Sequence, residues 1–88
     1  MSFEGRGLEA QSLRIDDIYV PVKRRKEIDE AKVAELAESI LENGLQTPIS
    51  VRLDGHRIVL VSGLHRLEAC KALGEKTIDA IQVRSRQH

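Results

Sequence analysis

A hairpin signal in the middle of the chain constrains the fold more than any other feature. The segment PISVRLDGHRIVLVSG, residues 48–63, alternates apolar and polar side chains up to Asp54-Gly55, a dipeptide typical of two-residue hairpin turns. After the turn, residues 58–61 are all apolar, which indicates a strand buried on both faces. The sequence therefore predicts two antiparallel strands, the second of them central in a sheet.

Two main helices are predicted on either side of this hairpin. The clearer one starts at Asp29, which can cap the first free N–H groups, and ends at Asn43 and Gly44. Its apolar residues recur at helical spacing and are Val33, Leu36, Ala37, Ile40 and Leu41. The second helix, residues 64–73, has apolar side chains all around it, so we expect it to pack on more than one side.

Two further strands are predicted near the ends of the chain. Residues 13–22, LRIDDIYVPV, alternate between apolar and polar with one slip at Asp16 and Asp17, which indicates a strand with a kink or bulge. The polar stretch KRRKE, residues 23–27, then reads as a loop. The segment TIDAIQV, residues 77–83, is a last short strand.

The length of 88 residues allows one hydrophobic core and no more. We expect a flexible, polar arm over residues 1–12, the compact domain over residues 13–83 and a polar end over residues 84–88. Because the chain stops without a closing signal, we expect it to be an N-terminal piece of something longer.

The charge balance argues against independent DNA binding. Fourteen basic and fourteen acidic residues give a net charge of zero, and only 2% of residues are aromatic, so stacking platforms for bases are nearly missing. A local basic patch would need folding to gather Arg52, Arg57, Arg84 and Arg86. Scattered on strands, the same arginines would simply be solvated.

The cysteine content and the hydropathy of the chain limit the cell compartments in which we expect it. Cys70 is the only cysteine, which excludes a disulfide framework and a thiolate metal cluster, and we expect it to be a small buried residue. No apolar stretch approaches the roughly 20 residues of a membrane span, and the start lacks a signal pattern. We expect a cytoplasmic protein without membrane or metal sites.

The junction between the apolar strand and the second helix carries the chain's most concentrated chemistry. Ser62 and Gly63 precede a helix start whose first N–H groups lack intrahelical partners and favour an anion. Gly63 allows close approach to the backbone, and His65 and Arg66 can donate to phosphate oxygens. A plainer interpretation remains open, in which Ser62 is only a cap, His65 lies on the surface and Arg66 pairs with Glu68 or another acid.

Two segments resemble known sequence boxes. IDEAKVAELAESILENGLQTPISVR is similar to the first ParB box, with a capped helix, a glycine and Pro-Ile opening a strand. SGLHRLEACKALG resembles the second, with a glycine before an arginine-bearing helix start. Over residues 13–83 the chain looks like a member of the ParB and sulfiredoxin superfamily. The resemblance implies an α+β fold with a mixed sheet of about four strands and two main helices.

In that superfamily the junction binds nucleotide phosphates, CTP in partition proteins and ATP in sulfiredoxin and free serine kinases. The resemblance implies a regulatory domain linked to DNA partition or transcription control, with the triphosphate at Gly63, His65 and Arg66. Magnesium could bridge the phosphates, although no protein ligand for it is apparent. The other residues implied in nucleotide binding are Ser62, Lys32, Ser39, Arg24, Arg25, Gln46 and Thr47.

Departures from the family pattern narrow the expected chemistry. Leu64 stands where sulfiredoxin has its reactive cysteine, so sulfinic acid repair is not expected. Partition proteins usually carry two arginines where this chain has His65 and Arg66, which leaves the preference for CTP open. The chain does not include the helix-turn-helix of ParB, so we expect contact with DNA only through additional domains or a partner.

Three other functions remain open. A phosphotransferase or NTPase needs a carboxylate base, and Glu27 is the candidate, although it could equally be a solvated loop charge. Nuclease activity needs converging carboxylates, and the dense candidates are Asp16 with Asp17 and Glu27 with Asp29 and Glu30. Adjacent strand residues point to opposite faces, and Asp29 is better explained as a helix cap, so both groups are poor candidates. A protein-interaction module with a vestigial pocket, including a homodimer, is the third.

Overall fold

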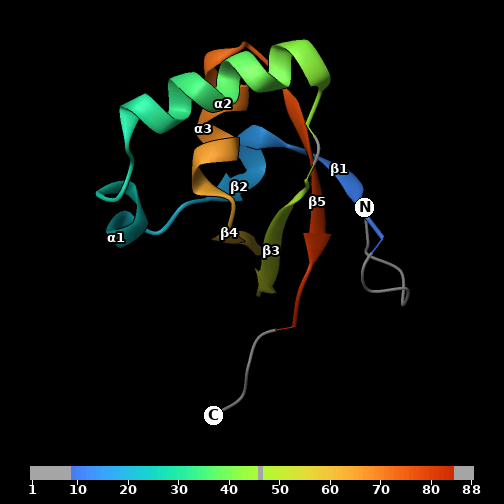
Figure 1. Ribbon diagram of the computed structural model, residues 1–88. Coiled ribbons are helices and arrows are strands. Elements are labelled where there is room, and N and C mark those ends of the chain that lie inside the picture. The colour runs from blue at the N-terminus through green and yellow to red at the C-terminus, as the bar shows by residue number, and fades with distance from the viewer. Residues whose placement is uncertain (1–8, 46, 85–88) are drawn as a thin grey trace.

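The computed structural model describes residues 9–45 and 47–84, whose elements are arranged as in Figure 1. In chain order they are β1 (Gln11–Arg14), a 3-10 helix (Ile15–Asp17), β2 (Ile18–Tyr19), α1 (Val22–Arg25), α2 (Glu30–Asn43), β3 (Ile49–Asp54), β4 (Arg57–Ser62), α3 (Leu64–Ala72) and β5 (Thr77–Gln82). Most of the expected N-terminal arm and the last four residues lie outside the described part of the chain. Among the described residues, the first strand, β1, starts at Gln11, two residues before the boundary expected at residue 13.

The strands form one mixed sheet in the order β1-β5-β3-β4-β2. The pairs β1/β5 and β3/β4 are antiparallel, whereas β3/β5 and β2/β4 are parallel. β4 is paired on both sides, and Val59 and Leu60 on opposite faces of it are both buried. The α+β class and the central position of the second hairpin strand are thus confirmed.

The described sheet has five strands, one more than the four or so expected, because the predicted kinked strand is in fact two. The chain turns through the 3-10 helix at Asp16 and Asp17, so β1 pairs with β5 and β2 pairs with β4. Leu13, Ile15 and Ile18 are all buried, which keeps the apolar pattern intact across the turn. The slip in the alternation at Asp16 and Asp17 indicated an interruption of the strand, but it did not show that the two halves pair with different strands.

The same turn requires the sheet to curl. β1 and β2 are at opposite ends of the strand order, and a flat five-stranded sheet would separate them by about 19 Å at about 4.8 Å per strand. A three-residue 3-10 helix advances only about 6 Å. The two edges are therefore brought close together, and the sheet wraps around the apolar side chains of its inner face.

Helix α2 begins as predicted. Oδ1 of Asp29 accepts hydrogen bonds from the backbone N–H groups of Ala31 at 3.0 Å and Lys32 at 3.4 Å, and Gly44 ends the helix with a φ of 78°. The expected apolar stripe is only partly covered, however. Val33 is buried and Ile40 packs against the core, but Leu41 is 75% exposed.

Helix α3 lies between α2 and the sheet, which explains why its apolar residues surround it (Figure 1). Leu67 is fully buried, and Leu64 and Cys70 are each 3% exposed. The expectation that Cys70 is a small buried side chain is confirmed. Burial, with smaller contributions from the charges of Glu75 and Asp79, raises the pKa of its thiol.

Two local predictions were wrong. Residues 23–27 are not simply a loop, because α1 covers Val22–Arg25. Val22, expected at the end of the first strand, is instead the first residue of this helix, and its side chain is 57% exposed. The hairpin turn is also shifted by one residue. Asp54 pairs with Arg57, so Gly55 and His56 form the turn, and Gly55 supplies the positive φ of 63°.

Candidate phosphate site at the start of α3

Gly63 is the N-cap residue of α3, and the structure leaves room for no other residue there. Its φ of 99° lies in the left-handed region that glycine adopts at low cost. A Cβ at this position would be 2.7 Å from Cγ2 of Ile49 and 3.1 Å from Nη2 of Arg66. Gly63 therefore has a structural role in the packing of the turn, besides any contact with a ligand.

The first turn of α3 is open to an anion. Gly63 has no side chain to cap it, and no side-chain cap hydrogen bond is present at this helix start. Ser62, which could have capped the helix, is instead the exposed last residue of β4. The backbone N–H groups at the start of α3 thus keep the partial positive charge of a helix N-terminus.

Arg66 is held at the edge of this turn without being neutralised. Its Nη2 donates to the carbonyl oxygen of Pro48 at 3.3 Å, and its Nε is buried without a hydrogen-bond partner. Arg66 forms no ion pair with any residue in the described part of the chain, including Glu68, which pairs with Lys71. Its guanidinium charge therefore has no counter-charge paired with it among the described residues.

His65 has a partner that the sequence did not reveal. Its Nε2 accepts a hydrogen bond from the backbone N–H of Asp29 at 3.0 Å, so the starts of α2 and α3 are joined directly. A ring nitrogen that accepts cannot carry the proton, which leaves Nδ1 as the donor of the neutral ring. This histidine is half-buried, and its ring is bonded to the start of α2.

Arg24 and Glu27 reach the same place from α1 and the turn after it. Nη1 of Arg24 donates to the carbonyl oxygen of Val61 at 2.7 Å, and its Nε is 3.2 Å from Oε1 of Glu27. The side chains of Arg24 and Glu27 are 31% and 61% exposed, so this ion pair is solvated and contributes little to stability. Both groups face the open space beside Gly63.

These residues enclose a cavity of about 320 Å³. It is called the phosphate cavity below, after the candidate ligand, and is lined by Arg24, Glu27, Lys32, Leu36, Gly63, Leu64, His65 and Arg66. Arginine and lysine supply three positive charges and Glu27 one negative charge, so the cavity has a cationic surplus in a chain of zero net charge. That surplus, combined with the uncapped helix start, makes it suited to a multiply charged anion.

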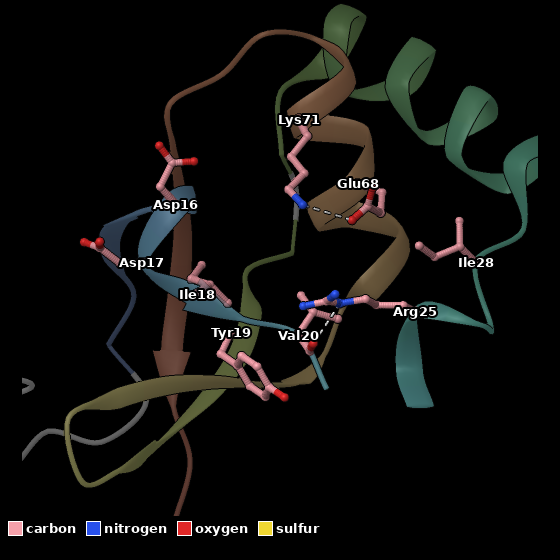
Figure 2. Close-up of a pocket in the computed structure, with 9 residues that line it drawn as sticks. All are labelled: Asp16, Asp17, Ile18, Tyr19, Val20, Arg25, Ile28, Glu68 and Lys71. Atoms are coloured by element: carbon pink, nitrogen blue, oxygen red, sulfur yellow. Dashed lines mark hydrogen bonds and ion pairs between the residues drawn. The ribbon is translucent and has the colours of Figure 1, made fainter. Parts of the chain in front are cut away.

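Several residues expected at the site are placed elsewhere. Arg25 does not line this cavity but a second one of about 520 Å³, where its Nε donates to the carbonyl oxygen of Val20 at 3.0 Å (Figure 2). Ser39 and Thr47 are exposed and do not line the phosphate cavity, and Gln46 lies outside the described residues. The sequence grouped Arg24 with Arg25, but adjacent residues of a helix point in different directions.

Leu36 lines the cavity, although it was expected only as part of the apolar stripe of α2. It is four residues after Lys32 on α2, the spacing that places two side chains on one helix face, and that spacing could have identified it. Leu36 provides the cavity with an apolar wall.

The other carboxylates that the structure describes are not gathered into a metal centre. Asp16 and Asp17 line the second cavity with Glu68 and the cations Arg25 and Lys71, separate from the phosphate cavity (Figure 2). Across residues 9–45 and 47–84 no group of three or more His, Cys, Asp or Glu side chains could hold a metal ion. Nor is any helix in that part of the chain long and apolar enough to cross a membrane.

Comparison with known proteins decides the family. The ParB N-terminal domain model matches residues 3–88. The chain belongs to the ParB N-terminal domain family. This ParB domain is 41% identical over 71 residues to a probable chromosome-partitioning protein ParB of Campylobacter jejuni, covering 80% of this chain and 26% of that protein. It is 38% identical over 72 residues to the stage 0 sporulation protein J of Bacillus subtilis, covering 81% of this chain and 26% of that protein. The domain thus spans about a quarter of the length of these relatives.

Solved structures confirm the superfamily fold. Sulfiredoxin from Arabidopsis thaliana superposes with a TM-score of 0.79 at 35% identity, covering 88% of this ParB domain and 86% of that chain. A C-terminally truncated ParB from Caulobacter crescentus, complexed with CTP-γ-S, gives a TM-score of 0.76 at 24% identity, covering 90% and 46%. A free serine kinase in complex with AMP gives 0.71 at 14% identity, covering 89% and 32%. The last two likenesses show the fold alone.

Proposed function

We propose that this ParB domain binds a nucleoside triphosphate, CTP or ATP, with the phosphate chain at the turn before α3. The observation that carries the proposal is the cavity beside Gly63, where three cations face one carboxylate over an uncapped helix start. A triphosphate carries several negative charges that can be shared among such donors.

The basic side chains of the cavity and the helix start have distinct roles in binding the phosphates. Arg66 supplies a fixed guanidinium whose hydrogen bond to Pro48 orients it, and the backbone N–H groups after Gly63 bind the adjoining phosphate oxygens. Lys32 and Arg24 neutralise the remaining charge from the other walls. His65 contributes a donor only through Nδ1, because Nε2 is engaged by Asp29.

The nucleotides named with the structural neighbours support the ligand class. CTP-γ-S is bound in the Caulobacter crescentus protein and AMP in the free serine kinase, on the fold that this chain shares. The donor set of the cavity fits phosphate and not a bare metal ion. Magnesium, when present, would be carried by the phosphates, since the described residues offer no cluster of ligands for it.

The biological setting follows from the relatives as a further part of the proposal. We place the domain in a cytoplasmic protein that acts in DNA partition or transcription control, with nucleotide binding as its regulatory step. The relatives named as chromosome-partitioning proteins are about four times as long as the matched segment. Contact with DNA would accordingly depend on other domains or on a partner, and formation of a homodimer stays a prediction.

Isothermal titration calorimetry with CTP, ATP, ADP and GTP, each with and without magnesium, tests the proposal. We expect heat of binding for CTP or ATP, weaker binding of ADP and a loss of affinity as salt is raised, because the contacts are charged. Inorganic triphosphate should compete with the nucleotide. Absence of binding for all four nucleotides at millimolar concentration would rule the proposal out.

A second candidate function is phosphoryl transfer, favoured by one specific observation. Glu27 lines the phosphate cavity and is oriented by Nε of Arg24, so a carboxylate faces the place proposed for the phosphates. In such a reaction a substrate hydroxyl oxygen attacks the γ-phosphorus, the bond to the β–γ bridging oxygen breaks, and Glu27 takes the hydroxyl proton.

Incubation with γ-labelled ATP or CTP and free serine distinguishes transfer from binding alone. Transfer predicts labelled phosphoserine from the wild type and none from Glu27→Gln, which keeps the size of the side chain but cannot take the proton. Nucleotide binding without label transfer would leave the regulatory function as the better account.

Sulfiredoxin activity is not part of the proposal. Leu64 precedes His65 and Arg66, is 3% exposed and has no nucleophilic atom. The resemblance to the Arabidopsis thaliana sulfiredoxin therefore concerns the fold and not the repair chemistry.

A further inference from the structure

A basic groove lies beside the phosphate cavity. It has a volume of about 430 Å³ and is lined by Pro21, Lys23, Arg24, Arg52, Val59, Leu60, Val61, Val83 and Arg84. None of these lining residues is acidic, so four cations surround the groove without an opposing charge in its wall. In a chain with zero net charge, this is a local concentration of positive potential.

Two of these four cations form no ion pair within the described fold, and a third is only weakly paired. Lys23 and Arg84 form no ion pair with a described residue. Arg52 is 3.9 Å from the Asp54 carboxylate, but the two side chains are 36% and 51% exposed, which makes this contact weak. Arg24, which lines both the groove and the phosphate cavity, is paired with Glu27 at 3.2 Å.

The other lining residues are aliphatic. Val59 and Leu60 are buried, whereas Pro21, Val61 and Val83 are half-buried and leave part of their apolar surface in the groove. No aromatic side chain lines it, so a nucleic acid base would find nothing on which to stack. Aliphatic side chains of a bound peptide could instead remove this apolar surface from water.

The basic groove holds only half of the patch that the sequence suggested for nucleic acid. Arg52 and Arg84 line it, but Arg57 lies over the ring of Tyr19, with Cζ 4.4 Å from the ring centroid, and Arg86 is outside the described residues. The cations that join Arg52 and Arg84 are Lys23 and Arg24, from α1.

We propose that the basic groove docks an acidic segment of a partner protein, with aliphatic side chains against its apolar floor and carboxylates at its rim. Charge complementarity identifies the partner as acidic, because arginine binds carboxylates through paired N–H donors. The half-buried aliphatic floor favours a peptide over a phosphate backbone, which has no apolar side chains to bury.

A selection from a displayed library of random twelve-residue peptides tests this proposal. It is run without nucleotide, so its outcome is independent of the proposed nucleotide binding. The double variant Lys23→Gln and Arg84→Gln removes two groove charges and leaves every residue of the phosphate cavity in place. Arg14→Gln with Lys76→Gln removes the same charge from exposed positions that line a different cavity.

We expect the wild type and the control variant to enrich peptides that combine several Asp or Glu residues with Leu, Ile or Val. The groove variant should bind the same synthetic peptides at least tenfold more weakly in fluorescence polarisation, with an unchanged thermal melt. Enrichment of neutral or basic peptides, no enrichment, or equal binding by the groove variant would overturn the proposal. Tighter binding of a single-stranded DNA 20-mer, lost in the groove variant, would assign the groove to nucleic acid instead.

Discussion

The backbone N–H of Asp29 donates to Nε2 of His65 at 3.0 Å and joins the starts of the two main helices, 36 residues apart in the sequence. Asp29 thereby serves both helices, because its carboxylate caps α2 while its amide fixes the imidazole at the start of α3. Because Nε2 accepts in this bond, Nδ1 is the ring nitrogen left to donate, and it is the atom proposed to face phosphate.

Replacing His65 tests this connection. His65→Leu removes the acceptor, so the free energy of unfolding should fall by about 0.5–1.5 kcal/mol, the net worth of one hydrogen bond. The amide of Asp29 should then exchange with deuterium markedly faster in NMR. His65→Gln, which can still offer an oxygen to this amide, should retain more of the protection. Unchanged exchange in His65→Leu would show that the bond does not persist in solution.

Gly63 and Gly74 form a matched pair for measuring the packing of the turn. Both have positive φ, 99° and 81°, but a Cβ on Gly63 would contact Ile49 at 2.7 Å, whereas nothing lies within 4 Å of one on Gly74. Gly74→Ala should cost about 1–2 kcal/mol for the backbone conformation alone. Gly63→Ala should cost a further 1–3 kcal/mol, roughly, for the steric conflict. Chemical denaturation measures both, and equal losses would contradict the close approach to Ile49.

Arg66 should contribute more to nucleotide affinity than to stability. Arg66→Ala removes a charged donor from the cavity and should weaken binding of CTP or ATP about 10- to 100-fold, from about 1.5–3 kcal/mol per charged hydrogen bond. Arg14→Ala, an exposed residue of β1, is the control and should bind normally. Titration calorimetry compares them. If Arg66→Ala bound nucleotide as tightly as wild type, this guanidinium would not contact phosphate.

The buried thiol of Cys70 should be unreactive at neutral pH. Burial raises its pKa, so the folded state keeps the neutral thiol at a pH where the unfolded chain begins to ionise. The contribution of the buried neutral thiol to stability is complete below the ordinary thiol pKa, and it is lost as pH rises through the raised pKa of the folded state. A thiol reagent should label the native protein far more slowly than the denatured one, and Cys70→Ala should reduce the alkaline fall in stability. Rapid labelling of the native state would disprove the burial.

Much of the fold was predictable because it depends on local signals. The Asp29 cap, the end of α2 at Gly44 and the paired central strand all follow from short-range chemistry. The division of the first strand was not predictable, since Asp16 and Asp17 mark a break without showing that the two halves pair with different partners. Partner choice depends on β5, which is some sixty residues away in the sequence.

The site shows the same limit. Gly63 and Arg66 could be identified from the strand-to-helix junction, because the helix start supplies the chemistry locally. The direction of Arg25 and the bond from Asp29 to His65 could not, since both depend on how α1 and α2 pack across the start of α3.

An NMR titration of the labelled domain with CTP and ATP tests the central claim most directly. The account predicts the largest amide shifts at Leu64, His65 and Arg66, with smaller ones at Lys32, and the same pattern with inorganic triphosphate. Shifts that avoid the start of α3, or a spectrum unchanged at saturating nucleotide, would contradict it.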